Sequence, residues 1–399
     1  MAGLMNGMEG IMDYYEESLK MHRLNKGKLE VVSKVPVTNK DELSTAYTPG
    51  VAQPCVEIEK NPDDAYVYTI KSNTVAVVSD GSAVLGLGNI GGLASLPVME
   101  GKAVLFKEFG GIDAFPICLD TRDVDEIVET VKMIAPTFGG INLEDISAPR
   151  CFEVEDRLKE ELDIPVFHDD QHGTAVVVSA AAINSFKLLK KNLKDISVVI
   201  TGAGAAGNAI VKMLINLGVR DIVICDREGI ISTDRLSRLS KDKIELLELT
   251  NKNNIAGTLA DAMVGRDLFI GVSGPGVLTE KMVRSMASDP VIFAMSNPEP
   301  EIMPDLAFSA GARIVGTGRS DFPNQINNVL VFPGIFKGAL ESRAEHITDD
   351  MKVAAAFALA ALVTEEELSP DYVIPDVFHK GVADSIASAV AKSWKENPC

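Results

Sequence analysis

The segment SVVITGAGAAGNAIVKMLINLGVRDIVICD, residues 197–226, decides the fold of the second half of the chain. Its first five residues are a short apolar run typical of a buried strand, and the glycine-rich turn GAGAAG follows at once. Apolar residues then recur at helical spacing over 208–217, and a second strand-like run ends in Asp226. A strand, a GxGxxG turn, a helix and a strand that ends in an acid predict a doubly wound parallel sheet of the Rossmann type.

There is a physical reason for glycine at these positions of the turn. They let the backbone approach a pyrophosphate at a helix N-terminus, and a carboxylate 19 residues after Gly207 can accept hydrogen bonds from a ribose diol. NAD is favoured because Asp226 would repel a 2'-phosphate, whereas Arg227 beside it could pair with one and admit NADP. The alternative is a tight turn without a ligand. The predicted dinucleotide site consists of Gly202, Ala203, Gly204, Ala205, Ala206, Gly207 and Asp226.

The 399 residues exceed what one ordinary core holds, which predicts two domains. Short apolar runs alternate with helical stretches along the whole chain, so the fold class is α/β. The apolar segment 174–189 predicts a helix that joins an N-terminal α/β substrate domain, residues 1–172, to a Rossmann-type domain, residues 173–399. The predicted strands are 74–78, 114–119, 165–167, 197–201, 221–225, 267–272, 291–295 and 313–316, and the predicted helices include 97–106, 124–134 and 152–162.

The net charge of the chain limits the classes of partner that it can bind. A formal net charge of -19 and a pI near 4.7 leave no basic surface for nucleic acid or an anionic membrane. Residues 1–17 carry acids where a signal peptide carries lysine or arginine, and the longest apolar run, 353–363, is too short to span a bilayer and predicts a buried helix. Five cysteines without CxxC spacing argue against a disulfide scaffold or a structural zinc site. We therefore expect a cytoplasmic protein.

Two acidic pairs precede the glycine-rich turn, Glu144-Asp145 and Asp169-Asp170. Such pairs are most often solvated surface charge. The second pair, however, follows a strand-like run and precedes an apolar helix, which predicts carboxylates at the carboxyl end of a strand. If Glu144, Asp145 and Asp170 converge, they form an all-oxygen site suited to Mg²⁺ or Mn²⁺. His168 and His172 suggest zinc, but without cysteine or HExxH they are better interpreted as orienting or core residues.

Lys102 and Tyr47 are candidates for acid–base chemistry. Lys102 lies in the mostly apolar stretch 97–106, where burial would lower its pKa toward that of a base. The alternative is a lysine whose amine reaches solvent from the flank of a helix. Tyr47 precedes the Pro49-Gly50 turn, where a phenol could be held against a ligand. From the residues alone, a packing role for Tyr47 is the simpler interpretation.

Several motifs together resemble those of the malic enzyme family, in its small-subunit microbial form. Their order and spacing cover nearly the whole chain, so chance agreement is excluded as an explanation. The motifs are residues 46–52, Asp80-Gly81 with Leu85-Gly86-Leu87-Gly88, Gly101-Lys102, Leu143-Glu144-Asp145 and residues 168–174.

The resemblance implies roles for these residues. Tyr47 would be the general acid and Lys102 the general base, with Asp169 hydrogen-bonded to the lysine. Glu144, Asp145 and Asp170 would hold the divalent cation. Asn297 and Asn328 match family positions that contact malate or the nicotinamide end of the cofactor.

The implied activity is oxidative decarboxylation of L-malate to pyruvate and CO2, with NAD or NADP reduced and with a metal ion required. Two alternatives remain: a malolactic-type reaction that keeps NAD bound and yields lactate, and a silent protein that senses NAD or a metabolite. The family also implies a homodimer or a dimer of dimers with a site shared between subunits. Longer members have an arginine for a substrate carboxylate where this chain has Ala83, so Arg122, Arg150 or a neighbouring subunit would replace it.

Overall fold

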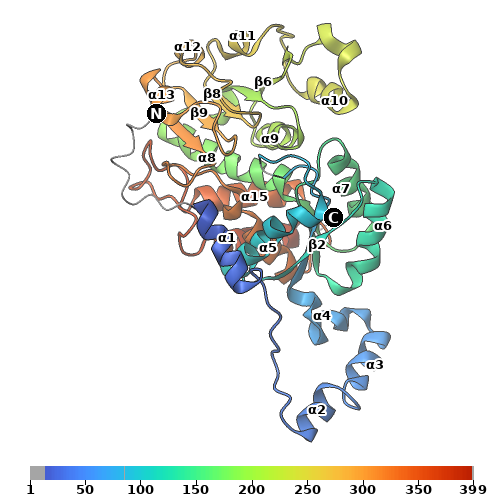
Figure 1. Cartoon of the computed structure of the whole chain (residues 1–399). Helices are drawn as coiled ribbons and strands as arrows, with labels where there is room; N and C mark the ends of the chain where they lie inside the picture. The colour runs from blue at the N-terminus through green and yellow to red at the C-terminus, as the bar shows by residue number, and fades with distance from the viewer. Residues whose placement is uncertain (1–13, 85, 398–399) are drawn as a thin grey trace, which may run out of the picture.

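The computed structural model describes residues 14–84 and 86–397. Leu85 of the LGLG motif and most of the acidic N-terminal segment used above to argue location lie outside the described residues. The chain forms two α/β units stacked on one another, and an N-terminal arm projects from the lower one (Figure 1). The α/β class is confirmed, whereas the division at residues 172 and 173 stays a prediction.

The lower unit is built on a parallel sheet with the strand order β2-β1-β3-β4. Alternate residues of β1 face opposite sides: Val75 and Val77 pack against α5 and α14, while Ala76 and Val78 pack against α6 and α7. Both faces are therefore covered, as a parallel sheet requires. The elements are β1 (Thr74–Ser79), α5 (Gly91–Gly110), β2 (Asp113–Cys118), α6 (Val124–Ile134), β3 (Gly140–Leu143), α7 (Arg150–Glu161) and β4 (Val166–His168).

The upper unit contains a six-stranded sheet in the order β10-β9-β8-β5-β6-β7, parallel except for the short edge strand β7. The chain runs outward from β5 to β7 and then returns to β8 on the other side of β5, so the switch point of a Rossmann-type sheet lies at the end of β5. Its elements are β5 (Ser197–Thr201), α9 (Ala205–Asn216), β6 (Asp221–Asp226), β7 (Gly229–Ile230), α10 (Lys241–Leu249), α11 (Leu259–Met263), β8 (Leu268–Gly271), α12 (Glu280–Arg284), β9 (Val291–Ala294), α13 (Pro304–Ser309) and β10 (Ile314–Thr317).

Helix α8 (Thr174–Leu188) joins the units, as predicted, and eleven of its residues are buried. The C-terminal helices α14 (Phe332–Glu341), α15 (Asp349–Ala360) and α16 (Val382–Glu396) return to the lower unit, where α14 packs on α5. The rings of Phe106 and Phe332 are 4.7 Å apart between centroids, so the two ends of the chain share one core.

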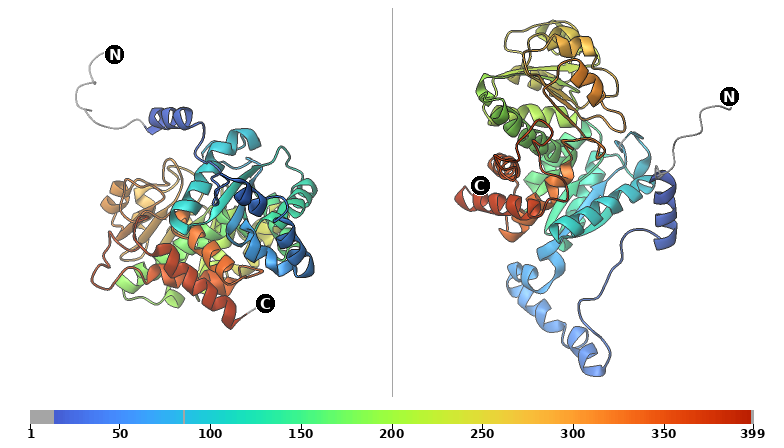
Figure 2. Two further views of the ribbon diagram at one scale, coloured as in Figure 1. Left: turned by 90° about the horizontal axis from the view of Figure 1, so that it is seen from below. Right: turned by 90° about the vertical axis from the view of Figure 1, so that its left-hand side faces the viewer.

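The N-terminal arm is formed by α1 (Tyr14–Asn25), α2 (Lys40–Ala46), α3 (Ala52–Lys60) and α4 (Ala65–Tyr68), and none of these helices has a buried residue. Helices α2 and α3 project away from the body in two views at right angles (Figures 1 and 2). The base of the arm is attached through Arg343, which lies 3.8 Å above the Tyr66 ring and pairs with Asp63. Within the described residues, no helix has the length and apolar character to cross a membrane.

Candidate active site

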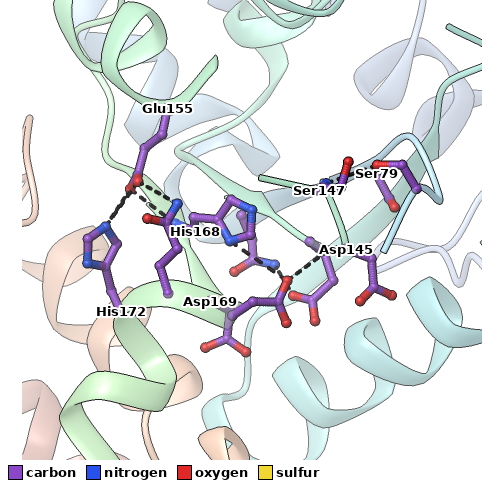
Figure 3. A network of polar contacts seen from close by, with 12 residues as sticks. Ser79, Asp145, Ser147, Glu155, His168, Asp169 and His172 are labelled. Atoms are coloured by element: carbon purple, nitrogen blue, oxygen red, sulfur yellow. Dashed lines mark hydrogen bonds and ion pairs between the residues drawn. The ribbon is translucent and has the colours of Figure 1, made fainter. Parts of the chain in front are cut away.

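The carboxylates meet because β3 and β4 are parallel neighbours. Glu144 and Asp145 follow β3, and Asp170 follows β4, so all three lie at the same edge of the sheet. Each offers an oxygen, and these oxygens lie within 4.8 Å of one another. The backbone amide of Asp145 donates to Oδ2 of Asp170 over 2.8 Å, which ties the two turns together (Figure 3). The structure thus places the predicted metal ligands together, although their role stays a prediction.

The cluster is short of positive charge. Burial raises the pKa of Asp145 to about 9, and the neighbouring Asp170 and Glu144 add to the shift. Oδ2 of Asp145 is buried and has no hydrogen-bond partner among the described residues. A buried, unpaired carboxylate oxygen beside two others fits a hard divalent cation. His168 and His172 are outside this cluster, which agrees with their interpretation as core or orienting residues.

Lys102 reaches the same carboxylates from α5. Its side chain is buried, and its Nζ lies 2.6 Å from Oδ2 of Asp169 and 2.8 Å from Oε1 of Glu144. The alternative of an amine in solvent is therefore wrong. So is the expectation of a lowered pKa: burial alone would lower the pKa of Lys102, but Asp169 and Glu144 outweigh it and raise this pKa above the usual range. The resemblance implied the hydrogen bond between Lys102 and Asp169, which the structure shows, whereas the contact between Lys102 and Glu144 was not predicted.

Asn328 borders this pair. A Cβ atom placed on Gly173 would lie 1.8 Å from Oδ1 of Asp169 and 3.2 Å from Cβ of Asn328, so a glycine is needed where these residues meet. The ring of Phe332, four residues after Asn328, lies 4.3 Å from Nζ of Lys102 and shields the ammonium from one side. The short helix η7 (Asn328–Leu330) thus brings Asn328 beside Asp169, and its contact with malate or the nicotinamide stays a prediction.

The glycine-rich turn has the packing that a nucleotide loop requires. Gly202 has a φ of +109°, and a Cβ there would lie 2.4 Å from the carbonyl oxygen of Val272. A Cβ on Gly207 would lie 1.8 Å from the oxygen of Gly202, whereas Gly204 faces open space. Helix α9 begins at Ala205 without a side-chain cap, so its first amides are free to bind a pyrophosphate. The residues present therefore fit a dinucleotide.

Asn297 lies on the loop after β9, opposite the LGLG loop of the lower unit. A Cβ on Gly86 would come within 3.6 Å of the carbonyl oxygen of Asn297 and 3.3 Å of Cδ of Pro298. The two units therefore approach each other at this loop. Asn297 itself is exposed, and its contact with the substrate or the cofactor stays a prediction.

Tyr47 is the predicted site residue that the chain does not bring to the others. It ends helix α2, its side chain is 66% exposed, and α2 lies at the far end of the arm from α5, which carries Lys102 (Figure 1). A packing role within its own chain is therefore wrong as well. Contact between Tyr47 and Lys102 therefore requires either a second subunit or a movement of the arm.

The arginines proposed to replace the missing family arginine differ in their surroundings. Nη2 of Arg150 donates to Oδ2 of Asp80 over 2.8 Å and to Oγ of Ser82 over 3.0 Å, and the amide of Ala83 donates to the carbonyl oxygen of Asp145. Arg150 thus borders the loop of residues 80–83, and this loop contacts the carboxylate cluster through the hydrogen bond from Ala83 to Asp145. Arg122 lines an open hollow of about 400 Å³ beside Asp80.

Sequence reasoning missed Glu155, which holds the turn that carries Asp169 and Asp170. This turn, η4 (Asp169–Gly173), is a single π-helical turn. The buried carboxylate of Glu155 accepts a hydrogen bond from Nε2 of His172 over 2.9 Å (Figure 3). It also accepts from the side-chain amide of Gln171 over 3.2 Å and from the backbone amide of His168 over 3.3 Å. A signal was present: Glu155 occupies a position on the apolar face of α7 that Cys151, Val154 and Leu158 share.

Replacement of Glu155 with alanine is expected to lower the free energy of unfolding by about 3 kcal/mol, because His172 and the turn lose a buried charged acceptor. Urea unfolding measures the change. Glu153→Ala is the matched control, since Glu153 lies in the same helix, is 63% exposed and should change stability by less than about 0.5 kcal/mol. Equal effects of the two substitutions would contradict a clamping role for Glu155.

Comparisons with known proteins agree with this geometry. Residues 26–159 match the family described as "Malic enzyme, N-terminal domain", and residues 171–394 match "Malic enzyme, NAD binding domain". The chain is 60% identical to the "Bifunctional malic/malolactic enzyme" of Bacillus subtilis (strain 168), over 96% of this chain and 94% of that protein. It is 59% identical to the "NAD-dependent malic enzyme" of Geobacillus stearothermophilus, over 92% of this chain and 76% of that protein. The crystal structure of the NAD-dependent malic enzyme from Thermotoga maritima superposes with a TM-score of 0.91 at 50% identity, over 94% of this chain and 98% of that one.

Proposed function

Because the chain belongs to the malic enzyme family and is thus an oxidoreductase with an NAD-binding domain, we propose that it converts L-malate to pyruvate and CO2 with reduction of NAD or NADP. The observation that carries the proposal is the meeting of a buried lysine with a carboxylate cluster at the edge of one sheet, opposite a nucleotide turn on the other. This arrangement joins metal binding, proton transfer and hydride acceptance in one cleft.

Glu144, Asp145 and Asp170 would hold a Mg²⁺ or Mn²⁺ ion, and the turn from Gly202 to Gly207 would hold the dinucleotide. When bound, the cation would stabilise negative charge on the C2 oxygen of malate, and the nicotinamide would accept the hydride from C2. Asn297 and Asn328 are our candidates for contacts with the substrate, supported by the position of Asn328 beside Asp169 and of Asn297 on the loop after β9. Arg150 is our candidate for the C4 carboxylate, because it borders the loop at Ala83.

Lys102 would take the proton of the C2 hydroxyl as the hydride leaves. Asp169 holds Nζ in place at 2.6 Å. A lysine must be neutral before it can accept a proton, and both carboxylates now raise its pKa. Glu144 must therefore turn from the ammonium before Lys102 can act as a base, and Glu144 is also the residue that the cation would engage. After loss of CO2, Lys102 would give its proton to the C2 oxygen to form the enol, and would take that proton back as Tyr47 protonates C3 to give pyruvate.

We propose a homodimer, or an assembly of such dimers, in which the arm of one subunit brings Tyr47 to the cleft of the other. The support is the exposure of Tyr47 together with an arm whose four helices bury no residue of their own. The arm exposes large apolar side chains that include Leu43, Val51, Val56, Val67 and Tyr68. Such a surface is typical of a subunit interface.

The experiment that tests the activity is an initial-rate assay with L-malate, Mn²⁺ and either NAD or NADP. Reduced cofactor is followed by absorbance, and the acid produced is identified. Pyruvate and reduced cofactor in equal amounts are expected. Absence of both, with the nucleotide still bound, would instead favour a silent sensor protein.

A malolactic-type reaction is the second candidate, because a relative of 60% identity is named a bifunctional malic/malolactic enzyme. That reaction would keep NAD in its site and release lactate in place of pyruvate. Lactate that accumulates without free NADH in the same assay would favour it. Pyruvate with NADH in equal amounts and no lactate would exclude it.

Removal of divalent cations by a chelator is expected to abolish turnover, and added Mn²⁺ should restore it, because three carboxylates converge and, among the described residues, Lys102 is the one lysine or arginine that forms an ion pair with any of them. Asp145→Asn should weaken Mn²⁺ binding more than about tenfold, since even outer-shell partners of a metal contribute that much. Electron paramagnetic resonance of free Mn²⁺ measures the affinity. The exposed Asp195→Asn is the control and should leave it unchanged. Undiminished Mn²⁺ affinity in Asp145→Asn would remove this residue from the set of ligands.

A further inference from the structure

Two loops follow the strands on one side of β5, whose end carries the glycine-rich turn. The SGPG loop, residues 273–276, follows β8, and the SNP loop, residues 296–298, follows β9 and carries Asn297. The SGPG loop begins beside the turn itself, because the carbonyl oxygen of Val272 would lie 2.4 Å from a Cβ on Gly202. In a sheet of this kind, ligands bind in the crevice outside the carboxyl ends of the strands. Both loops therefore border the proposed nucleotide and substrate site.

One buried side chain, that of Glu301, holds both loops. Oε1 of Glu301 accepts from the backbone amide of Ser273 over 2.9 Å, and Oε2 accepts from the backbone amide of Ser296 over 3.0 Å. The carbonyl oxygen of Pro300 also accepts from the amide of Gly276 over 3.2 Å. Each loop thus donates an amide to a different oxygen of the same carboxylate.

The surroundings of Glu301 are those of a dedicated acceptor. Its exposed fraction is 0%, and it forms no ion pair with any of the described residues. Burial raises the pKa of Glu301, while the amides of Ser273 and Ser296 act in the opposite direction. A Cβ on Gly271, the last residue of β8, would lie 2.4 Å from Cδ of Glu301, so a glycine is needed there to leave room for the carboxylate. Loop amides, and not an opposite charge, therefore stabilise this group.

We propose that Glu301 is a positioning residue, which holds the SGPG and SNP loops in one arrangement and thereby sets the position of Asn297. The inference rests on the proposed function, in which Asn297 contacts the substrate. A carboxylate suits this role because both of its oxygens accept, and hydrogen bonds to an ionised acceptor are about twice as strong as neutral ones. Cδ of Pro298 would lie 3.3 Å from a Cβ on Gly86 of the lower unit, so a displaced SNP loop would also change the contact between the units.

Glu301→Gln tests this role, because glutamine keeps the size of the side chain but has one acceptor oxygen, so at least one loop loses its acceptor. With malate, Mn²⁺ and NAD we expect kcat to fall about 10- to 100-fold, since a displacement of about 1 Å can cost about 10²-fold. The affinities for adenosine 5'-diphosphate, by calorimetry, and for Mn²⁺, by electron paramagnetic resonance, should stay at their wild-type values. Glu299→Gln is the matched control, because Glu299 lies in the same segment and is exposed.

Hydrogen exchange, followed by mass spectrometry, reports on the loops without any turnover. In Glu301→Gln at least one of the segments that contain Ser273 and Ser296 should exchange about tenfold faster, because a hydrogen bond to a charged group is lost. Strand β6 should keep its wild-type exchange. Gly271→Ala is a second variant, which displaces the carboxylate with a Cβ atom and keeps its charge. It should reproduce both the fall in kcat and the faster exchange.

The outcomes separate a positioning role from a general role in the fold. A wild-type kcat in Glu301→Gln would overturn the inference and leave the proposed function intact. Equal losses of turnover, nucleotide affinity and Mn²⁺ affinity would overturn it too, since Glu301 would then support the fold as a whole. Unchanged exchange of both loops would likewise contradict it. Absence of malate turnover in the wild-type protein would overturn the proposed function together with this inference.

Discussion

Replacement of Lys102 with methionine is expected to slow malate oxidation about 10²- to 10⁴-fold, which is the usual contribution of a general base. Methionine keeps the length of the side chain in the buried position on α5 but can neither accept a proton nor pair with Asp169. Glu144 and Asp169 then lose the ammonium group that pairs with them. Because burial already raises the pKa of Asp169 to about 8, that residue can take up a proton at neutral pH and spare the fold an unpaired charge. Initial rates at saturating malate, Mn²⁺ and cofactor measure the effect.

The control for this substitution lies in the same helix. Lys107 is 55% exposed and pairs with Asp113 at the surface, so Lys107→Met should keep the wild-type rate. Thermal unfolding and nucleotide binding, measured on both variants, show that the fold and the dinucleotide site persist. A rate for Lys102→Met within about threefold of the wild type would exclude Lys102 as the base.

Local patterns in the sequence were sufficient to predict several helices and strands. Helix α6 has the bounds 124–134 predicted from its apolar period, and β5 has the predicted bounds 197–201. Both have a regular apolar pattern and clear flanking residues. Helix α5 begins at Gly91, six residues before the predicted start at Pro97, and Pro97 lies inside the helix. Strand β3, with only four residues, was not predicted although it carries Glu144 and Asp145 to the site.

The candidate site was predictable as a set of residues and less so as an electrostatic arrangement. Once β3 is known as the parallel neighbour of β4, the convergence of the two acidic pairs follows, because the carboxyl ends of parallel strands meet at one edge. The pairing of Lys102 with Glu144 and Asp169 depends on the order of β3 and β4 in the sheet and on the approach of α5, which no local pattern specifies. The ion pairs of Asp226 with Arg235 and Lys243 could not be predicted from a local pattern either. Both partners follow Asp226 in the sequence and are brought to it by the fold.

The proposal that Tyr47 serves the cleft of a partner subunit is tested by a mixed oligomer, which gives the largest expected change. Tyr47→Phe and Lys102→Met alone should each turn over about 10²- to 10⁴-fold more slowly than the wild type. If the arm crosses to the partner, a mixed dimer of these variants contains one cleft with both wild-type residues and one cleft with both substitutions. Its rate per dimer should therefore recover to about half of the wild-type rate. Co-expression with two different affinity tags isolates the mixed dimer for the rate measurement.

A second pair of variants supplies the control that makes this recovery specific. Lys102 and Asp145 belong to the same unit of one chain and lie around the same carboxylate, Glu144. A mixed dimer of Lys102→Met with Asp145→Asn therefore has one substitution in each cleft and should stay slow, whichever way the arms run. If Tyr47 instead reached the cleft of its own chain by a movement of the arm, the first mixed dimer would also have one substitution in each cleft and would stay slow. Recovery in the first pair and none in the second would occur only if the tyrosine of one subunit serves the lysine of the other.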